Sequence, residues 1–339
     1  MVLERIYVVR HGFRSSWTVN PQTGTYSGIP SPTGIPGDPA LTSYGIDQSK
    51  QLARHLMTLD PKVDKVYSSP FYRCLQTMAP FMELQKQLQL QQAEDNPGHD
   101  TRTLTGAPGG PGWGAASAVT TVLPEHGIRE WFGSAPFRHP EPAGPEVLKR
   151  LFPSYDDSYV STVKPSARGE SLEQLQDRVT RALRGIIEQC DADGTRTIVL
   201  CSHAAVIILM GRILTGQVPA SVDVDDFHAY TCGVSLYSRR KASSATGGRI
   251  TDDSRHGRDS ASSNPGKWHG AFPRAPIPDD KADVTGNWDC DLNSDCSFLS
   301  GGQERGCLRF EPNLTIVDAW DTNGSKILVT IISPITPFR

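Results

Sequence analysis

Several features that assign a protein to a familiar class are missing from this 339-residue sequence. Basic and acidic residues nearly cancel, with Lys+Arg 34 against Asp+Glu 37, so the chain lacks an overall positive field for binding nucleic acid. No apolar run approaches the roughly 20 residues of a membrane-spanning helix. No basic and then apolar signal segment precedes the first predicted strand. We therefore expect a cytoplasmic or nuclear protein that binds neither membranes nor nucleic acid directly.

Closely spaced cysteine pairs are also missing. The seven cysteines are an odd number, and most of them lie inside apolar segments, as reduced and buried thiols do. The spacing of Cys290, Cys296 and Cys307 lacks the tight pairs of a zinc ribbon. We therefore predict no metal site in this part of the chain.

What the sequence does contain is an alternation of apolar strands and amphipathic helices up to about residue 238. The first strand is the β-branched and aromatic run from Ile6 to Val9. Ser171 and Gln174 form a capping box at the start of one helix. The alternation predicts a three-layer α/β/α sandwich around a mostly parallel central sheet. The predicted strands cover residues 6–9, 63–67, 119–123, 197–201 and 232–237, and the predicted helices begin near residues 42, 71, 171 and 204.

Composition divides the chain into three parts. Residues 1–238 form the predicted α/β domain, with a Gly- and Pro-rich flexible insertion at about 95–118. Residues 239–283 are polar and form a predicted linker. Residues 284–339 show short apolar runs between turn signals and predict a small β-rich C-terminal unit. We expect the apolar side chains of this unit, such as Trp288, to be exposed and to favour a protein partner.

The candidate functional residues follow strands or begin helices. Arg10 and His11 come directly after the first strand, where open α/β sheets bind their ligands. An imidazole can attack phosphorus, and a guanidinium can hold a phosphoryl group through two parallel hydrogen bonds. Arg73 lies in the first turn of a helix, where the dipole favours a phosphate, and His203 follows the apolar strand 197–201. These residues predict a phosphate site.

Each candidate also has a simpler structural explanation. An isolated Arg73 could be a surface arginine on a helix, and an isolated His203 could be a hydrogen-bonded core histidine. Glu130, which follows the third predicted strand, could form only a solvated ion pair with Arg129. The agreement of several motifs on one site favours the functional interpretation.

Together these motifs resemble the histidine phosphatase superfamily, branch 1, which has the fold of the cofactor-dependent phosphoglycerate mutases and related phosphatases. The resemblance covers residues 3 to about 238. It implies a phosphatase that hydrolyses a phosphomonoester without a metal or another cofactor, because guanidinium and imidazolium groups supply the positive charge. The motifs are Arg10-His11-Gly12, Leu41-Thr42-x-x-Gly45-x-x-Gln48, Ser68-Ser69-Pro70-x-x-Arg73-x-x-Gln76-Thr77, Glu130, Gly169-Glu170-Ser171 and Ser202-His203-Ala204.

The resemblance also implies a role for each residue of the site. His11 would attack in line and become a phosphohistidine, which water then hydrolyses. Glu130 would protonate the leaving alcohol as the general acid. Arg10, Arg73 and His203 would bind the phosphoryl oxygens.

Arg14 distinguishes this chain from the mutases of the same superfamily. The mutases have Glu-Ser after the Arg-His-Gly motif, whereas this chain has Phe13-Arg14-Ser15. Arg14 resembles the additional phosphate-binding arginine of the acid phosphatase, phytase and T-cell-signalling-suppressor branches. A further cation favours a phosphatase, so we do not expect phosphoglycerate mutase activity.

A second resemblance concerns the C-terminal part of the chain. The segments Gly286-Asn287-Trp288 and Ser297-Phe298-Leu299-Ser300-Gly301-Gly302 are similar to the tail of the small tau subunit of fungal RNA polymerase III transcription factor IIIC. In that subunit the tail forms a dimerisation barrel with a partner subunit. The resemblance implies an alternative function, an assembly subunit that binds a partner through residues 284–339 and carries a vestigial or auxiliary phosphatase site.

Overall fold

The computed structural model describes residues 2–20, 22–95, 118–217, 219, 226–240, 286–304, 317–320 and 326–329. Residues 96–117 of the predicted insertion and 241–283 of the predicted linker lie outside the described residues. None of the described helices combines the length and the apolar character that crossing a membrane requires.

A six-stranded sheet with the order β5-β4-β6-β1-β7-β8 forms the centre of the fold. The strands β5, β4, β6 and β1 run parallel, whereas β7 and β8 are antiparallel to their neighbours. This mostly parallel sheet confirms the predicted fold class. The strands of the sheet are β1 (Arg5–Arg10), β4 (Lys65–Ser68), β5 (Val122–Pro124), β6 (Thr197–Ser202), β7 (Val234–Arg239) and β8 (Trp288–Asp295). Two hairpins lie outside it, β2 (Trp17–Val19) with β3 (Tyr26–Gly28) and β9 (Val317–Trp320) with β10 (Lys326–Val329).

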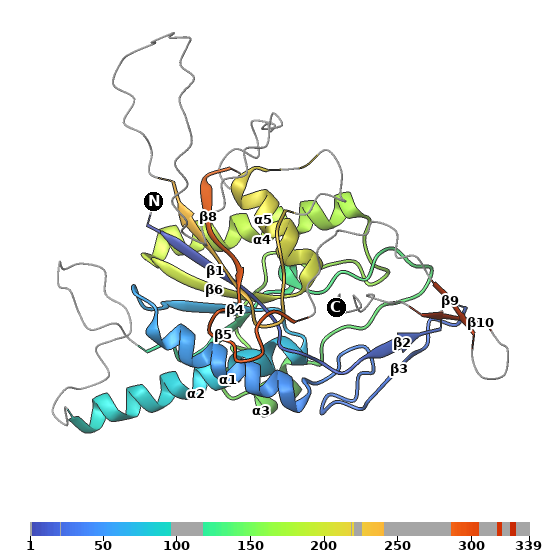
Figure 1. The fold of residues 1–339 in the computed structure, drawn as a ribbon, viewed down its shortest axis with the longest axis horizontal. Helices are drawn as coiled ribbons and strands as arrows, with labels where there is room; N and C mark the ends of the chain where they lie inside the picture. The colour runs from blue at the N-terminus through green and yellow to red at the C-terminus, as the bar shows by residue number, and fades with distance from the viewer. Residues whose placement is uncertain are drawn as a thin grey trace, which may run out of the picture.

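Helices cover both faces of the sheet (Figure 1). Alternate residues of β1 enter two different core clusters, because successive side chains of a strand point to opposite faces. Ile6 and Val8 pack with α4 and α5, whereas Tyr7 and Val9 pack with α1 and α2. The helices are α1 (Ser43–Thr58), α2 (Tyr72–Asp95), α3 (Pro145–Leu151), α4 (Leu172–Asp193) and α5 (Ala204–Thr215), with a short 3₁₀ helix η2 (His126–Ile128).

Local capping interactions fix where the helices begin and end. The Ser171 hydroxyl accepts a hydrogen bond from the Gln174 backbone N–H, and the Gln174 side chain accepts one from Ser171, so the predicted capping box is confirmed. The same helix, α4, ends at Gly194, whose φ of 83° lies in the left-handed region that glycine adopts without strain. The Thr42 hydroxyl caps α1 by accepting from the Gly45 N–H.

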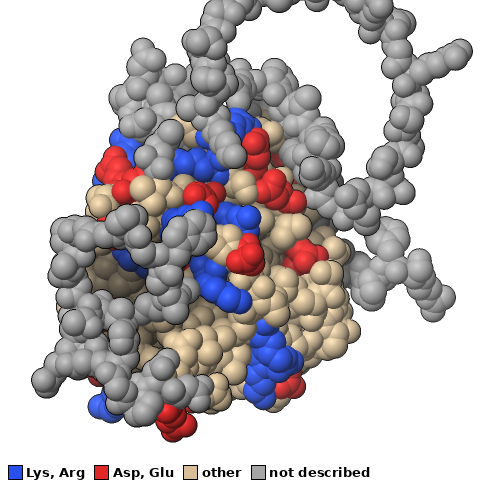
Figure 2. All heavy atoms as spheres, turned by 90° about the vertical axis from the view of Figure 1, so that its left-hand side faces the viewer, with Lys and Arg blue, Asp and Glu red and all other residues tan. Residues whose placement is uncertain are grey.

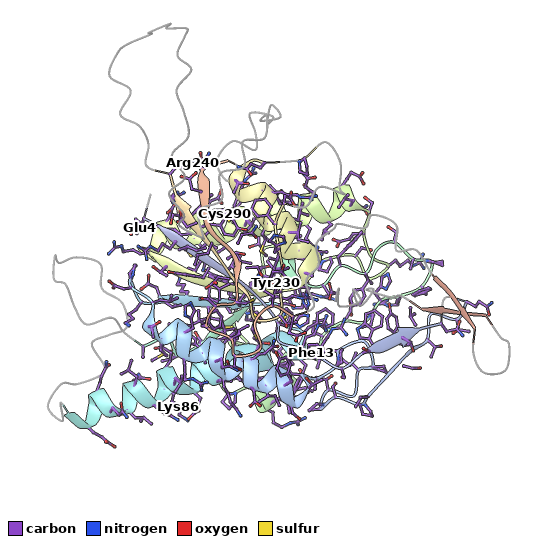
Figure 3. All side chains as sticks on the ribbon, in the orientation of Figure 1. Glu4, Phe13, Lys86, Tyr230, Arg240 and Cys290 are labelled. Carbon is purple, nitrogen blue, oxygen red and sulfur yellow. The ribbon has the colours of Figure 1, made fainter. Side chains whose placement is uncertain are left out.

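The parallel strands bring their carboxyl ends to one edge of the sheet. β1 and β6 pair in register, with Arg10 opposite Ser202. In Figure 3, Glu4 marks the amino end of β1 at the left, and Phe13 lies beyond its carboxyl end, near the centre of the view. The face viewed in Figure 2, at the amino ends of the strands, mixes positive and negative side chains. Ion pairs such as Arg196 with Glu4, at 2.8 Å, account for this mixture.

The edge strand β8 corrects the predicted domain division. It pairs with β7, and the side chain of Trp288 at its start is fully buried in the same core cluster as α4 and α5. The expectation that Trp288 is exposed in a separate C-terminal unit is therefore wrong. This strand completes the main sheet, while the other domain boundaries remain predictions.

The segment after β8 packs against α1. The ring of Phe298 stacks on His55, with ring centroids 4.2 Å apart. The Ser300 backbone N–H donates to the side-chain oxygen of Gln51 at 2.7 Å. At the end of this segment the carbonyl of Glu304 accepts from the Thr231 N–H at 3.0 Å. Residues 286–304 thus connect the sheet edge to α1 and to the segment before β7.

Candidate active site

His11 lies directly after β1 and has a defined tautomer. Its Nδ1 is 2.8 Å from the Gly12 carbonyl oxygen. A carbonyl only accepts, so Nδ1 carries the hydrogen and Nε2 keeps its lone pair. Burial and the nearby cations Arg73 and His203 hold the pKa of His11 well below its ordinary value. At neutral pH this imidazole is uncharged and can act as a nucleophile through Nε2.

His203 follows β6 and lies beside His11, with ring centroids 5.3 Å apart. Its Nε2 is 2.8 Å from the Ser69 hydroxyl, and its Nδ1 is 3.3 Å from Oε2 of Glu130. Burial alone would lower the pKa of His203, but the negative charges of Cys74 and Glu130 raise it above its ordinary value. These two anions therefore favour the protonated form of His203, next to a His11 whose protonated form is disfavoured.

Arg73 connects two buried carboxylates at the start of α2. Its Nη2 is 3.2 Å from Oε2 of Glu130, and its Nη1 is 3.2 Å from Oδ1 of Asp38. The other oxygen of Asp38 accepts from the Tyr72 backbone N–H at 2.9 Å. Burial raises the pKa of Asp38 to about 6, although Arg73 opposes the shift. Asp38 thus orients the guanidinium of Arg73 and fixes the first turn of α2.

The segment before Glu130 is held by a buried arginine of α4. Arg178 donates to the carbonyls of Gly127 at 2.8 Å and Arg129 at 3.1 Å. Its Nε lies 2.9 Å from the carboxylate of Glu170. The Gly169-Glu170-Ser171 motif thus supports the backbone that carries Glu130.

Glu130 is ionised in this arrangement. Burial alone would raise its pKa, but His203 and Arg73 hold the pKa far below its ordinary value. One oxygen, Oε2, contacts both of these cations. A general acid must carry a proton. Glu130 can therefore serve as one only after another anion has replaced it as the partner of Arg73 and His203.

Two further arginines surround His11. Arg10 donates from Nη1 to the Ala229 carbonyl at 2.6 Å, and Arg14 donates from Nη1 to the Ser15 carbonyl at 3.0 Å. Both are buried, and the charges of both lower the pKa of His11. The structure therefore brings together all of the predicted site residues, which come from four separate segments of the chain.

The charge of the site favours an anion. Ligand atoms of His11, Glu130 and His203 lie within 4.8 Å of one another, a spacing that a metal ion can use. However, the charges of Arg10, Arg14 and Arg73 all act on His11. Such a positive field opposes a divalent cation and stabilises an oxyanion such as phosphate.

Sequence reasoning missed some of the residues that shape the site. Asp38 is the single acidic residue in the Pro- and Gly-rich segment 13–40. That feature of the sequence could have marked it as a candidate site residue. Cys74 places its Sγ 3.5 Å from Nε2 of His203. Thr77, the last residue of the Ser68-Ser69-Pro70 motif, had no role predicted from the sequence; it accepts from the Gly12 N–H at 2.9 Å and donates to the Arg73 carbonyl at 2.7 Å. These three side chains connect the start of α2 with the loop after β1 and with His203.

The sheet order and the paired histidines at its carboxyl edge define an α/β protein of the histidine phosphatase type. The sequence model of that family agrees, matching residues 6–95 and 142–245. The chain therefore belongs to the histidine phosphatase superfamily (branch 1).

Two curated relatives have different functions. The chain is 29% identical over 315 residues to the transcription factor tau 55 kDa subunit of Saccharomyces cerevisiae, an alignment that covers 90% of this chain and 58% of the relative. It is 26% identical over 243 residues to the ecdysteroid-phosphate phosphatase of Drosophila melanogaster, covering 65% of this chain and 28% of the relative. The chain thus spans less than two thirds of the length of either protein.

Among solved structures, the chain is similar to the ecdysone phosphate phosphatase of Bombix mori in complex with tungstate. The TM-score is 0.47 at 16% identity, over 75% of this chain and 97% of that one. A phosphoglycerate mutase from Bacillus anthracis gives a TM-score of 0.37 at 15% identity, over 69% of this chain and 87% of that one.

Proposed function

We propose that this protein is a metal-independent phosphatase that hydrolyses a phosphomonoester through a phosphohistidine on His11. The observation that carries the proposal is the hydrogen bond from Nδ1 of His11 to the Gly12 carbonyl, at 2.8 Å. It leaves Nε2 as an unprotonated nucleophile whose neighbouring charged side chains are mainly cationic. Arginines and an imidazolium supply the charge that a metal supplies in other phosphatases.

Substrate binding activates Glu130 in this proposal. Its Oε2 occupies the position between Arg73 and His203 that suits a phosphoryl oxygen. When the phosphoryl group binds to Arg73 and His203, Glu130 loses the two interactions that lower its pKa. The adjacent negative charge and burial then raise that pKa, so the carboxyl binds a proton. The free site holds the base form of Glu130, and the occupied site holds the acid form.

The reaction then proceeds in two displacements at phosphorus. Nε2 of His11 forms the P–N bond while the P–O bond to the alcohol breaks, and Glu130 gives its proton to the departing oxygen. Glu130 next removes a proton from an incoming water molecule, whose oxygen attacks phosphorus and breaks the P–N bond. Arg10, Arg14 and Arg73 stabilise the equatorial oxygens in both steps.

Aromatic side chains beside the site favour an aromatic or otherwise apolar leaving group. The Phe132 ring lies 6.0 Å from Phe71, which in turn lies 5.7 Å from His203. Trp17 and Tyr26 of the β2–β3 hairpin extend this set of half-buried rings, at centroid distances of 5.9 Å and 6.3 Å from Phe132. Such rings offer a stacking surface next to the phosphate position.

An aryl phosphate assay tests the proposal. We expect the protein to hydrolyse a generic aryl phosphate and the variant His11→Ala to lose this activity. His55→Ala is the matched control, because His55 stacks on Phe298 outside the site. Absence of hydrolysis from mildly acidic to neutral pH would contradict the proposed phosphatase activity. Equal rates for the unchanged protein and His11→Ala would contradict it as well.

A second function is favoured by the similarity to the tau 55 kDa subunit, which extends over 90% of this chain. We propose that the protein is also a nuclear assembly subunit that binds a protein partner through its C-terminal part, within residues 284–339. A chain truncated after Glu304 is expected to keep phosphatase activity and to lose the partner in a pull-down from nuclear extract. Retention of the partner by the truncated chain would exclude residues 305–339 as the binding segment.

A further inference from the structure

A buried arginine beside the active site has no part in the proposed reaction. Arg129 directly precedes Glu130, and only 7% of its surface is exposed. Its Nη2 donates to the Pro140 carbonyl at 3.2 Å, and its Nη1 lies 3.5 Å from Nδ1 of His126. Its Nε is buried and has no acceptor. A guanidinium carries five N–H donors, so most of the donors of Arg129 have no acceptor among the described residues.

The positive charge of Arg129 is not paired with a carboxylate within the described part of the chain. Two other buried arginines of this region are paired, Arg178 with Glu170 at 2.9 Å and Arg73 with Asp38 at 3.2 Å. Burial lowers the pKa of Arg129 to about 10, so the guanidinium still carries its charge at neutral pH. A buried charge without a hydrogen-bonded counterion destabilises a fold. An anion supplied by a ligand would remove this cost.

The carboxylate that acts most strongly on Arg129 from a distance is that of Glu141, which raises the pKa of Arg129 against the effect of burial. The side chain of Glu141 is half exposed and lies 3.9 Å from Nη2 of Arg138. A solvated carboxylate of this kind contributes little to the stability of a neighbouring charge. A ligand can replace its effect without breaking a buried ion pair.

The ring of Phe71 connects Arg129 with the phosphate site. The guanidinium carbon of Arg129 lies 5.3 Å from the centre of this ring, and that of Arg73 lies 4.6 Å from it. The centre of the His203 ring is 5.7 Å from the same point. Arg129 and two of the proposed phosphate-binding residues therefore surround one aromatic side chain. A single small molecule can reach both Arg129 and the phosphate position.

A small cavity lies beside these residues. Arg129 and Glu130 line it together with Phe132 and Glu170. Its volume is about 10 Å³, which is room for one water-sized group. The carboxylate of Glu170 is engaged by Arg178, 2.9 Å away, so its charge in the wall is compensated. The space next to Arg129 therefore fits one oxygen atom of a small anion.

We propose that Arg129 binds a carboxylate on the leaving group of the substrate, so that the protein acts on a phosphomonoester with a second negative charge a short spacer away from phosphorus. This inference rests on the proposed phosphatase function, which places the phosphoryl group against His11, Arg73 and His203. The half-buried ring of Phe132, 6.0 Å from Phe71, then packs against the spacer.

The charge and the size of this site favour a carboxylate over a second phosphoryl group. Burial and the charge of Arg129 lower the pKa of His126 to about 3, so this neighbouring imidazole adds no second positive charge. One guanidinium matches the single charge of a carboxylate and can hold it through two parallel hydrogen bonds. A phosphoryl group has a third oxygen and a larger charge, whereas the cavity has room for only one water-sized group.

Calorimetry with phosphonates tests the inference, because a P–C bond is not hydrolysed and binding is measured without turnover. The probes are benzylphosphonate and its ortho, meta and para carboxy derivatives, added to the full chain. At least one carboxy isomer is expected to bind about 10- to 100-fold more tightly than benzylphosphonate, as a hydrogen-bonded ion pair with arginine allows. Arg129→Gln is expected to lose this preference and to keep its affinity for benzylphosphonate. Arg129→Lys is expected to keep part of the preference.

Arg138→Gln is the matched control, because it removes an exposed arginine that follows Arg129 closely in the sequence. It is expected to keep the full preference for the carboxy isomer. Thermal unfolding of each variant shows whether a loss of binding reflects a loss of the fold. The comparison of the four phosphonates on the unchanged protein needs no variant, so it decides even where Arg129→Gln does not fold, and Arg129→Lys then identifies the residue.

Equal or undetectable affinity for all four phosphonates would overturn the inference, and so would a preference that persists in Arg129→Gln. Hydrolysis of phenyl phosphate and of the matching carboxyphenyl phosphates is measured separately. Preferential binding of a carboxy isomer without any hydrolysis would contradict the phosphatase proposal and support the carboxylate site. Hydrolysis of phenyl phosphate without a preference in binding would support the phosphatase and contradict the carboxylate site.

Discussion

Two adjacent histidines have pKa values that their different partners shift in opposite directions. His11 donates to a carbonyl and lies among arginines, so its pKa is lowered by burial and by positive charge. The neighbouring His203 lies against Glu130 and Cys74, which raise its pKa despite burial. Pairs of titratable groups whose pKa values are pushed apart are a common basis for assigning chemical roles. In the proposed reaction, the pair supplies a neutral nucleophile, His11, and a cationic binding group, His203.

This difference predicts a pH dependence of anion binding. The pKa of His203 is raised, so its charge is fully present below its ordinary pKa and is lost as pH rises through the raised value. We expect the competitive inhibition constant of inorganic phosphate to increase on the alkaline side of neutrality. The measurement is a series of inhibition constants with an aryl phosphate as substrate.

The variant His203→Gln serves as the control for this pH series. It keeps a hydrogen-bonding side chain and removes the titrating group, while the ionisation of phosphate itself affects both proteins equally. The inhibition constant of phosphate is expected to change less with pH in this variant than in the unchanged protein. Parallel curves for the two proteins would assign the effect to another group.

A second prediction concerns the single residue Arg10. Its guanidinium is buried next to His11, so its charge is worth most in the transition state. Arg10→Ala is expected to lower kcat by about 10²- to 10³-fold, as the loss of one stabilising donor does. Arg5→Ala, at the other end of β1, is the control and is expected to change kcat little. An effect of less than about tenfold for Arg10→Ala would contradict direct contact with the phosphoryl group.

The sequence predicted the charged residues of the site but not their supporting contacts. Arg10, His11 and Arg73 stand next to recognisable strand ends and helix starts, which the pattern of apolar residues reveals. Asp38 and Cys74 carry no such local signal, because their roles depend on partners that only folding brings near. Asp38 meets Arg73 across 35 positions of sequence, and Cys74 meets His203 across 129.

Among the secondary-structure elements, the amino end of α1 approaches the loop after β1 unusually closely. A Cβ placed on Gly45 would lie 2.0 Å from the carbonyl oxygen of Phe13 and 2.8 Å from its backbone nitrogen. Gln48, one turn further along α1, accepts from the same Phe13 N–H at 2.9 Å. Glycine is required here because the helix backbone packs directly against the loop that carries His11 and Arg14.

The variant Gly45→Ala tests this contact. We expect it to displace the loop, lower kcat at least tenfold and destabilise the fold by about 1–3 kcal/mol, despite the better helix propensity of alanine. Asp47→Ala, at an exposed position of the same helix, is expected to change both quantities little. Activity and thermal unfolding are measured together. An unchanged kcat in Gly45→Ala would show that the loop tolerates the displacement.

Long helices and strands were predicted from the sequence more accurately than short ones. Apolar periodicity and the Ser171 capping box located α4, and the run from Thr197 to Cys201 located β6. The short hairpin of β2 and β3 and the seven-residue helix α3 lie in segments rich in Pro, Gly and aromatic residues, where no period repeats often enough to be recognised. Packing against the site, rather than local propensity, determines their conformation.

At the scale of the whole molecule, β8 makes the C-terminal part of the chain necessary for the fold. Trp288 is fully buried against the core cluster that also contains α5. Trp288→Ala is expected to lower the free energy of unfolding by about 3–5 kcal/mol. Phe298→Ala is the comparison variant, because Phe298 is only partly buried and stacks on the surface residue His55. Chemical denaturation measures both, and equal losses would contradict the central position of Trp288.

The sequence could not indicate that β8 joins the main sheet. Its neighbour β7 ends at Arg239, and the polar segment that follows has the composition of a linker. Pattern analysis finds a strand from local residues, but the choice of its neighbour depends on which sheet edge is available. Trp288 was the one residue that favoured a place in the main sheet, because a large aromatic residue at the start of a strand is more stable when it is buried.

The late position of β8 along the chain has a consequence for synthesis on the ribosome. The strand at the centre of the sheet, β1, is made first, whereas the strand that closes its far edge emerges only after most of the polypeptide has been translated. Until then the hydrophobic surface that Trp288 covers is open to chaperones. Products of premature termination before this residue retain that open surface and are expected to be recognised by quality-control proteases, so chains that extend through β8 are expected to accumulate in preference.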